Sequence, residues 1–128
     1  MSVEQNTAIL RRWLEEVMNA GRLDLVGEIV DPYWRNHDAL LPPLTGIEGA
    51  RQLAELFRTG LSDLRVSTED LVAQGDRVAA RLRLKGVHRG ELMGIAPTGN
   101  PIDISAIGIF RMARGRLAES WVTVDALS

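Results

Sequence analysis

The stretch RVAARLRLK, residues 77–85, decides the fold class of this chain. Its apolar members, Val78, Ala80, Leu82 and Leu84, alternate with a mainly basic set. Side chains two residues apart share one face of a strand, so one face of this strand is apolar and the other is wet. Such alternation is typical of an antiparallel sheet that is covered on one side only.

Further strand-like segments flank this stretch. Leu64 to Ala73 precedes it across the turn Gly75-Asp76. After it, a connector rich in glycine and proline leads to Ile102–Met112, and Arg114-Gly115 turns the chain into Leu117–Asp125. The second half of the chain therefore predicts a sheet of about four main strands.

The first half has the period of helices instead. Ser2 and Gln5 match a capping box, and apolar residues recur at helical spacing from there to Gly21. A shorter helix is expected from Leu23 to Val30, because the following Asp31-Pro32 disfavours helical geometry.

A third helix is expected after the proline-rich loop around Pro42 and Pro43. Thr45 and Glu48 match a second capping box, and the apolar residues that follow keep helical spacing up to Leu61. Three helices followed by a curved antiparallel sheet predict an α+β fold in which the helices close one side of the sheet. We expect residues 1–128 to form a single domain.

The composition excludes several classes of protein. The chain has 15 Lys and Arg against 17 Asp and Glu, which leaves no basic surface for nucleic acid. It has no cysteine, so disulfides and thiolate metal sites are excluded. No apolar run is long enough to span a membrane, and no secretory signal is recognisable. We expect a soluble, cytoplasmic protein without a membrane partner.

Asp125 is the first candidate catalytic residue. In an extended strand it shares a face with Leu117, Trp121 and Thr123. If that face lines a cavity, the carboxylate has the apolar surroundings that suit acid/base work. The alternative is a carboxylate in solvent near the end of the chain, where order is often lost.

The two histidines are further candidates. His88 continues the apolar phase of the strand at 77–85, which points it toward the helix-covered side as a possible donor, base or acid. Asn36-His37-Asp38 gathers three hydrogen-bonding side chains, of which His37 and Asp38 face opposite ways if the segment is extended. The alternatives are a structural histidine and a polar turn. The spacing matches no metal site.

Several aromatic residues could bind a flat apolar ligand by stacking. They are Trp13, Trp34, Trp121 and Phe110, with Tyr33 and Phe57 as further members of the set. The alternative is that they fill the core, and Trp13 and Phe57 lie on the apolar stripes of their helices.

Taken together, these motifs resemble the SnoaL-like polyketide cyclases of the nuclear transport factor 2-like (NTF2-like) superfamily over nearly the whole chain. The resemblance is carried by Trp13, Asn19-Ala20-Gly21-Arg22-Leu23-Asp24, Asn36-His37-Asp38, Gly46–Gly49, Ser62–Val66, Gly86–Glu91, Gly94–Gly99 and Ile109-Phe110-Arg111, and by Gly115, Glu119, Trp121 and Asp125. It implies a cone-shaped fold in which the bent sheet and the helices enclose a mostly apolar pocket.

The resemblance also implies an activity. Members catalyse intramolecular aldol ring closure of hydrophobic polycarbonyl precursors without metal or organic cofactor. The family's proposed acid/base aspartate corresponds to Asp125, and His88 or His37 would donate to the enolate oxygen or orient the substrate. We expect Asp38, Trp34, Trp121, Phe110 and Trp13 to contact the substrate, and a homodimer or higher homo-oligomer to form through the exposed sheet face.

Departures from the family pattern keep other functions open. Ser120 stands where relatives commonly have the histidine of Glu-His-Trp. Gly108 stands where ketosteroid isomerases place an oxyanion-hole acid, although Asp38 lies near the position of their base. The Asp-Arg-Asp set of epoxide hydrolases is not found. The alternatives are isomerase or hydrolase chemistry at Asp38 and a noncatalytic binding or dimerisation module of the same fold.

Overall fold

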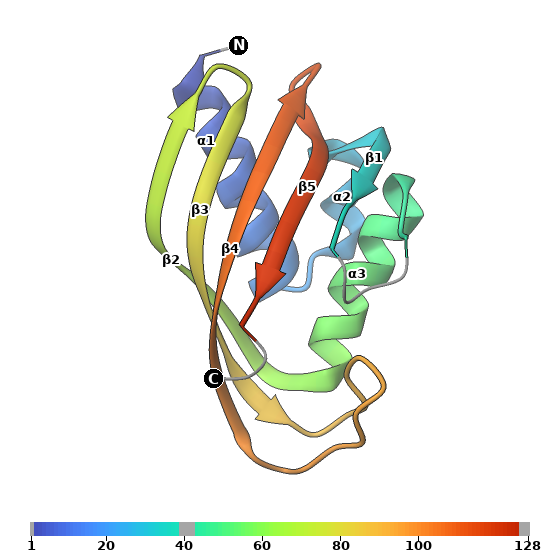
Figure 1. Cartoon of the computed structure of the whole chain (residues 1–128). Coiled ribbons are helices and arrows are strands. Elements are labelled where there is room, and N and C mark those ends of the chain that lie inside the picture. Colours follow the sequence, from blue (N-terminus) through green and yellow to red (C-terminus); the bar gives the residue numbers. More distant parts are fainter. Residues whose placement is uncertain (1, 39–42, 126–128) are drawn as a thin grey trace.

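The computed structural model describes residues 2–38 and 43–125 (Figure 1). Helix α1 spans Val3–Arg12 and starts with the predicted capping box, since Ser2 and Gln5 each bond the other's backbone. It continues as a π-helix, η1, over Trp13–Asn19. Gly21, with a φ of 74°, ends the run in the left-handed conformation that glycine adopts most readily.

The second helical segment is shorter than predicted. A single 3-10 turn, η2, covers Leu23–Leu25, helix α2 covers Val26–Ile29, and strand β1 already begins at Val30 and runs to Asn36. The strand tolerates Pro32 because β1 lies at an edge of the sheet, where a missing N–H is harmless.

Helix α3 spans Gly46–Gly60, as the apolar spacing predicts. The second capping box is wrong: the Thr45 side chain makes no cap hydrogen bond, and the Glu48 carboxylate pairs with Arg51 one turn further along the helix. Apolar burial of one helix face is therefore sufficient to place this helix without its expected cap.

The remaining strands are β2 Leu61–Gln74, β3 Arg77–His88, β4 Pro101–Ala113 and β5 Arg116–Val124. The sheet order is β1-β5-β4-β3-β2, and the four long strands pair antiparallel as predicted. The fifth member is β1, which overlaps the segment Tyr33–Asp38 that the sequence favours as a short strand or extended stretch. Its parallel pairing with β5, which makes the sheet mixed, was not predicted.

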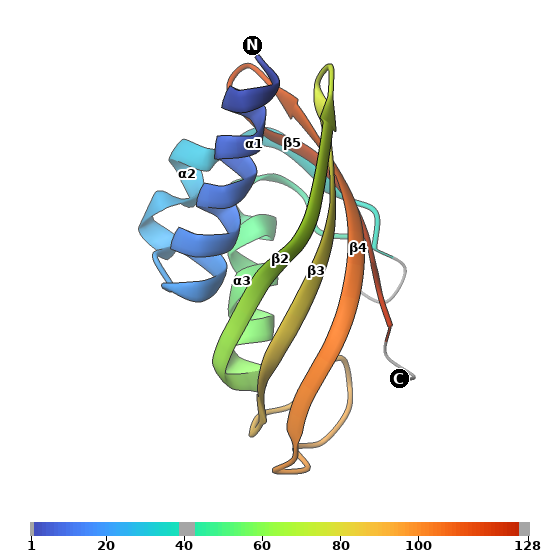
Figure 2. The same cartoon turned by 90° about the vertical axis from the view of Figure 1, so that its left-hand side faces the viewer.

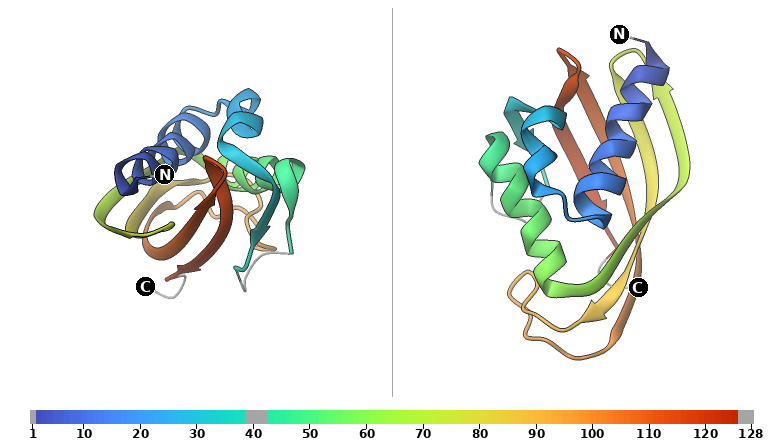
Figure 3. Two further views of the ribbon diagram at one scale, coloured as in Figure 1. Left: turned by 90° about the horizontal axis from the view of Figure 1, so that it is seen from above. Right: turned by 180° about the vertical axis from the view of Figure 1, so that it is seen from behind.

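The helices cover one face of the curved sheet and leave the other face open (Figures 2 and 3). The alternating apolar residues of β3 point into the covered side, where Val78, Ala80, Leu82 and Leu84 are all buried. The predicted α+β fold class is therefore confirmed. Within the described ranges, no helix is long and apolar enough to cross a membrane.

A β-bulge in β5 changes which residues share a face. Arg111 pairs with Glu119 but the next residue, Met112, pairs with Leu117, so Ala118 is the extra residue. Leu117 is buried in the core, whereas Trp121 lies on the open face. The prediction that Leu117 and Trp121 point together is therefore wrong, because the sequence pattern does not reveal the bulge.

Candidate active site

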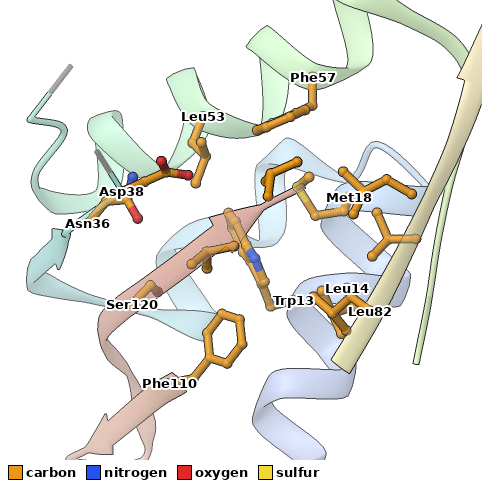
Figure 4. A pocket seen from close by; sticks show the side chains of 14 residues that line it. Trp13, Leu14, Met18, Asn36, Asp38, Leu53, Phe57, Leu82, Phe110 and Ser120 are labelled. Atoms are coloured by element: carbon orange, nitrogen blue, oxygen red, sulfur yellow. The ribbon is translucent and has the colours of Figure 1, made fainter. Parts of the chain in front are cut away.

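A cavity lies between the helices and the covered face of the sheet (Figure 4). Its volume is about 60 Å3 within a hollow of about 560 Å3 that includes the open mouth. The lining is mainly apolar: Trp13, Leu14, Met18, Leu53, Phe57, Val66, Leu82, Leu84, Phe110, Val122 and Val124, with Asn36, Asp38 and Ser120 as its polar members. Apolar walls with a few polar groups are typical of small-molecule sites.

The π-helix supplies one wall of the cavity. Trp13 and Met18 are five residues apart, the hydrogen-bonding interval of a π-helix, and both line the cavity with Leu14. The end of this helix is held by Arg58 of α3, whose Nη1 donates to the carbonyls of Met18 and Asn19 at 2.8 Å each. The wall is thus fixed from two helices.

Phe110 forms part of the sheet side of the cavity, and the adjacent Gly108 makes room for it. A Cβ atom at Gly108 would lie 2.7 Å from Cε2 of the Phe110 ring, closer than real contacts allow. The space that a side chain at position 108 would need is therefore occupied by the ring of Phe110.

The end of β1 places two polar side chains in the cavity. Asn36 and Asp38 point inward because alternate residues of an extended chain share a face, and Figure 4 shows them on the same side of the cavity. Asn36 is 8% exposed, and its Nδ2 is buried without a hydrogen-bond acceptor among the described residues. An unpaired buried donor costs free energy, so this amide is poised for an acceptor on a ligand.

Ser120 is the third polar group of the lining. Its Oγ accepts a hydrogen bond of 3.0 Å from Nε1 of Trp34, and both residues are buried. Because Trp34 only donates, the hydroxyl hydrogen of Ser120 stays available to a ligand. Trp34 itself lies in the core behind Ser120 and is not among the described residues that line the cavity.

His37 lies on the opposite, outer face, as the alternation predicts. Its Nε2 is 2.7 Å from Oε2 of Glu119, whose other oxygen accepts from Nε of Arg111 at 2.8 Å. Burial raises the pKa of Glu119, but the hydrogen bonds from Arg111 and His37 and their charges lower it more, so its pKa is below the usual value. Trp121 is also outside, with the guanidinium of Arg77 5.3 Å from the ring centroid.

His88 is buried, in the predicted phase, at the end of β3. Its Nδ1 is 3.2 Å from Oγ1 of Thr98, and its Nε2 has no partner in the described part of the chain. It does not line the cavity, which reaches only Leu82 and Leu84 of this strand.

Asp125 is exposed and does not line the cavity either. Its backbone N–H donates to the carbonyl of Ser105 at 2.9 Å, which continues the pairing of β5 with β4. Asp125 continues the alternation of Trp121 and Thr123, which do not line the cavity. The residues between them, Ser120, Val122 and Val124, face the cavity.

The structure thus brings Trp13, Phe110 and Asp38 together around one cavity and keeps Trp34, Trp121, His37, His88 and Asp125 out of its lining. The sequence reasoning did not propose Asn36 and Ser120 as site residues. The signal for Asn36 was its phase, because it alternates with Trp34 on β1 and with Asp38 just after β1. In residues 2–38 and 43–125, no group of three or more His, Asp and Glu side chains could hold a metal ion.

Comparison with known proteins agrees with this architecture. The chain is 29% identical over 119 residues to aklanonic acid methyl ester cyclase AcmA of Streptomyces galilaeus, covering 90% of this chain and 81% of that protein. A SnoaL-like protein from Jannaschia sp. CCS1 superimposes with a TM-score of 0.87 at 28% identity, over 97% of this chain and 88% of the other.

TsrD from Streptomyces laurentii superimposes with a TM-score of 0.88 at 25% identity, over 99% of this chain and 92% of the other. The family model described as SnoaL-like polyketide cyclase matches residues 8–128. With its fold, cavity and sequence in agreement, the chain belongs to the SnoaL-like polyketide cyclase family.

Proposed function

We propose that this protein is an acid/base enzyme that closes a ring in a hydrophobic polycarbonyl substrate by intramolecular aldol addition, using its own side chains. The proposal assigns the base to Asp38 and two hydrogen-bond donors to Asn36 and Ser120. Among the described residues that line the cavity, these three are polar and the others are apolar. Aldol chemistry needs this combination, because a proton leaves carbon while negative charge develops on oxygen.

The proposed steps conserve protons and electrons. The Asp38 carboxylate takes a proton from a carbon flanked by carbonyl groups, and the electron pair moves onto the carbonyl oxygen as an enolate. Asn36 Nδ2 and the Ser120 hydroxyl donate to that oxygen. The enolate carbon then attacks a second carbonyl carbon of the same molecule, and the resulting alkoxide takes the proton back from Asp38.

The observation that carries this proposal is the buried Nδ2 of Asn36, which has no hydrogen-bond partner among the described residues and lies in the cavity that Asp38 also lines. A buried polar atom without a partner is uncommon in folded proteins and is frequent at functional sites. The free energy lost by leaving the donor unpaired is recovered when an acceptor binds. The hydrogen bond is strongest when that acceptor carries negative charge.

Asp125 is the rival base, because the resemblance assigns that role to it. The two assignments separate in a turnover assay with aklanonic acid methyl ester, the compound in the name of the AcmA relative. We expect Asp38→Asn to reduce kcat by about a hundredfold or more, while Asp125→Asn keeps most of it. Loss of turnover in Asp125→Asn alone would overturn the assignment to Asp38.

Asn36→Leu tests the donor. It removes the amide while keeping a similar volume, so ligand binding should be retained and kcat should fall by about tenfold or more. If the wild-type protein binds the ester tightly but never converts it, the noncatalytic binding module is the better description. Binding is measured by calorimetry. Ring closure is measured as a change in the absorption spectrum of the ester without a change in its mass.

The assembly proposal concerns the open face of the sheet. Val72, Ala79, Ile109 and Trp121 are paired across four neighbouring strands and form one row on this face. Val72 is 65% exposed, and Ile107 beside this row is 60% exposed. We propose that a second copy of the chain, also in the cytoplasm, covers this row, because contiguous exposed apolar surface marks association sites.

The oligomeric state tests this assembly. Ile109→Arg places a charge in the middle of the row and should give a monomer in light scattering. Tyr33→Arg is the matched control, because Tyr33 is 81% exposed and lies on β1 away from the row. A wild-type monomer at all concentrations would contradict the proposal.

A further inference from the structure

A second hollow lies behind one wall of the cavity. It is lined by residues of the π-helix η1, of strand β2 and of the end of α1. The elements η1 and β2 pack against each other. Its volume is about 470 Å3, against about 60 Å3 for the cavity. Its lining is polar, with Arg11, Arg65, Glu15 and Asn19 among its members. We call it the η1–β2 groove.

The wall between the groove and the cavity is one side chain thick. Leu14 and Val66 line both hollows, and no other described residue does. They are 4% and 5% exposed, so each fills the boundary almost completely. The two hollows would therefore join if either side chain moved aside.

The two halves of this wall differ in mobility. The Asn19 amide bonds both backbone groups of Val66, accepting from its N–H at 2.6 Å and donating to its carbonyl at 2.9 Å. Val66 is also β-branched and has a stiff side chain. Leu14 has two rotatable side-chain bonds and is not β-branched, so it is the half that can move.

The groove carries charges suited to an anion. Arg11 and Arg65 both line it, and neither guanidinium forms a salt bridge or hydrogen bond in residues 2–38 and 43–125. Glu15 is the single carboxylate among the described residues of the lining, so these residues carry an excess of one positive charge. Unpaired guanidinium groups are well matched to carboxylate, sulfonate or phosphate groups.

We infer that the η1–β2 groove binds the anionic end of an amphipathic ligand whose apolar, carbonyl-bearing end enters the cavity past Leu14. Leu14 is the gate between the two halves of this extended site. The ligand class is therefore an aromatic or polycarbonyl compound with a terminal anionic group. This inference rests on the proposed use of the cavity for a ligand, and it is independent of the chemistry assigned to Asp38.

Two fluorescent probes test the anion site. Anilinonaphthalene sulfonate has the required apolar rings and anionic group, and phenylnaphthylamine has the rings without the sulfonate. We expect saturable binding of both, with tighter binding of the sulfonate. Arg11→Gln and Arg65→Gln should each weaken sulfonate binding about fivefold and leave the neutral probe unchanged. Arg89→Gln is the matched control, since Arg89 is exposed and outside both hollows.

The gate is tested by kinetics. Leu14→Ala should speed association of the sulfonate probe several-fold in stopped-flow measurements, and Leu14→Val is the milder variant if the alanine form is poorly folded. Probe binding requires no proton transfer and is measured without turnover, so it separates this site from the catalytic proposal. Equal effects of the Arg11, Arg65 and Arg89 variants, or an absence of saturable sulfonate binding to the wild type, would overturn the inference.

Discussion

The imidazole of His37 stacks on the indole of Trp121, with ring centroids 5.0 Å apart and planes inclined by 13°. The imidazole of His37 also forms a hydrogen bond with the carboxylate of Glu119 through Nε2. His37 is therefore held on the outer face of the sheet in two directions. Because it lies between Asn36 and Asp38 in the chain, this anchor fixes the direction in which both neighbours enter the cavity.

Replacement of His37 should consequently affect turnover from outside the cavity. We expect His37→Ala to lower kcat by about tenfold or more, because small displacements of reacting groups have large effects on rate. His37→Gln keeps a donor for Glu119 and should recover part of the loss. Tyr33→Ala, an exposed side chain on the same strand, is the control. Unchanged kcat in His37→Ala would refute the anchoring role.

Glu119 should make stability depend on acidity. Its lowered pKa means that the folded state holds the carboxylate charged more strongly than the unfolded chain does. The stabilisation is complete at pH values above the unfolded pKa and disappears as the pH falls through the lowered folded pKa. Glu119→Gln should thus be less stable near neutral pH, and its difference from the wild type should shrink below about pH 4.5. Urea unfolding at a series of pH values measures this, and a constant difference would contradict it.

Gly108 should tolerate no side chain without rearrangement of the cavity. In Gly108→Ala the new methyl group would meet the Phe110 ring, so the ring must rotate and the fold should lose about 1–3 kcal/mol. Thermal unfolding measures the loss of stability. A change in the fluorescence of bound phenylnaphthylamine would report the displacement of the Phe110 ring. Gly27→Ala is the control for steric contact, since nothing lies within 4 Å of a Cβ atom there and Gly27 is not among the residues with positive φ.

Arg114 should be important for folding, although its own side chain is 65% exposed. It pairs with Asp31, a carboxylate of β1 that is 1% exposed and also accepts from the Tyr33 N–H. Arg114→Ala would leave a buried charge with fewer partners, and we expect a loss of about 3–5 kcal/mol. Asp31→Asn in the same background should restore part of it, because it removes that charge. An unfolding midpoint equal to that of wild type in Arg114→Ala would show that the pair is not needed.

The fold could be predicted from the sequence where side-chain period decides structure. The alternation at residues 77–85 identified the long antiparallel strands, and the spacing from Ser2 to Gly21 identified the first helix. The parallel pairing of β1 with β5 could not be predicted, because it joins segments about a domain length apart and has no local pattern. The π-helix was equally invisible, since its apolar spacing also suits an α-helix.

The site depends on strand phase, and phase is lost at irregularities. The alternation at Asn36-His37-Asp38 correctly placed His37 and Asp38 on opposite faces, but it did not show which of the two faces the cavity. The bulge at Ala118 defeated the same reasoning on β5, where one extra residue separates Leu117 from the phase of Trp121. Ser120 therefore faces the cavity, although in the sequence it stands out only as a departure from the family pattern.

The π-helix at Trp13–Asn19 also has a consequence for how such a cavity can diversify. A π-turn accommodates one residue more than an α-turn, so deleting a single residue there would restore regular α geometry. Each residue of an α-helix turns by about 100°, and the deletion would rotate the preceding part of the helix by that amount relative to the sheet. A one-codon change in length could thus replace a whole wall of the cavity at once, which is a shorter route to a new ligand than successive substitutions of its lining.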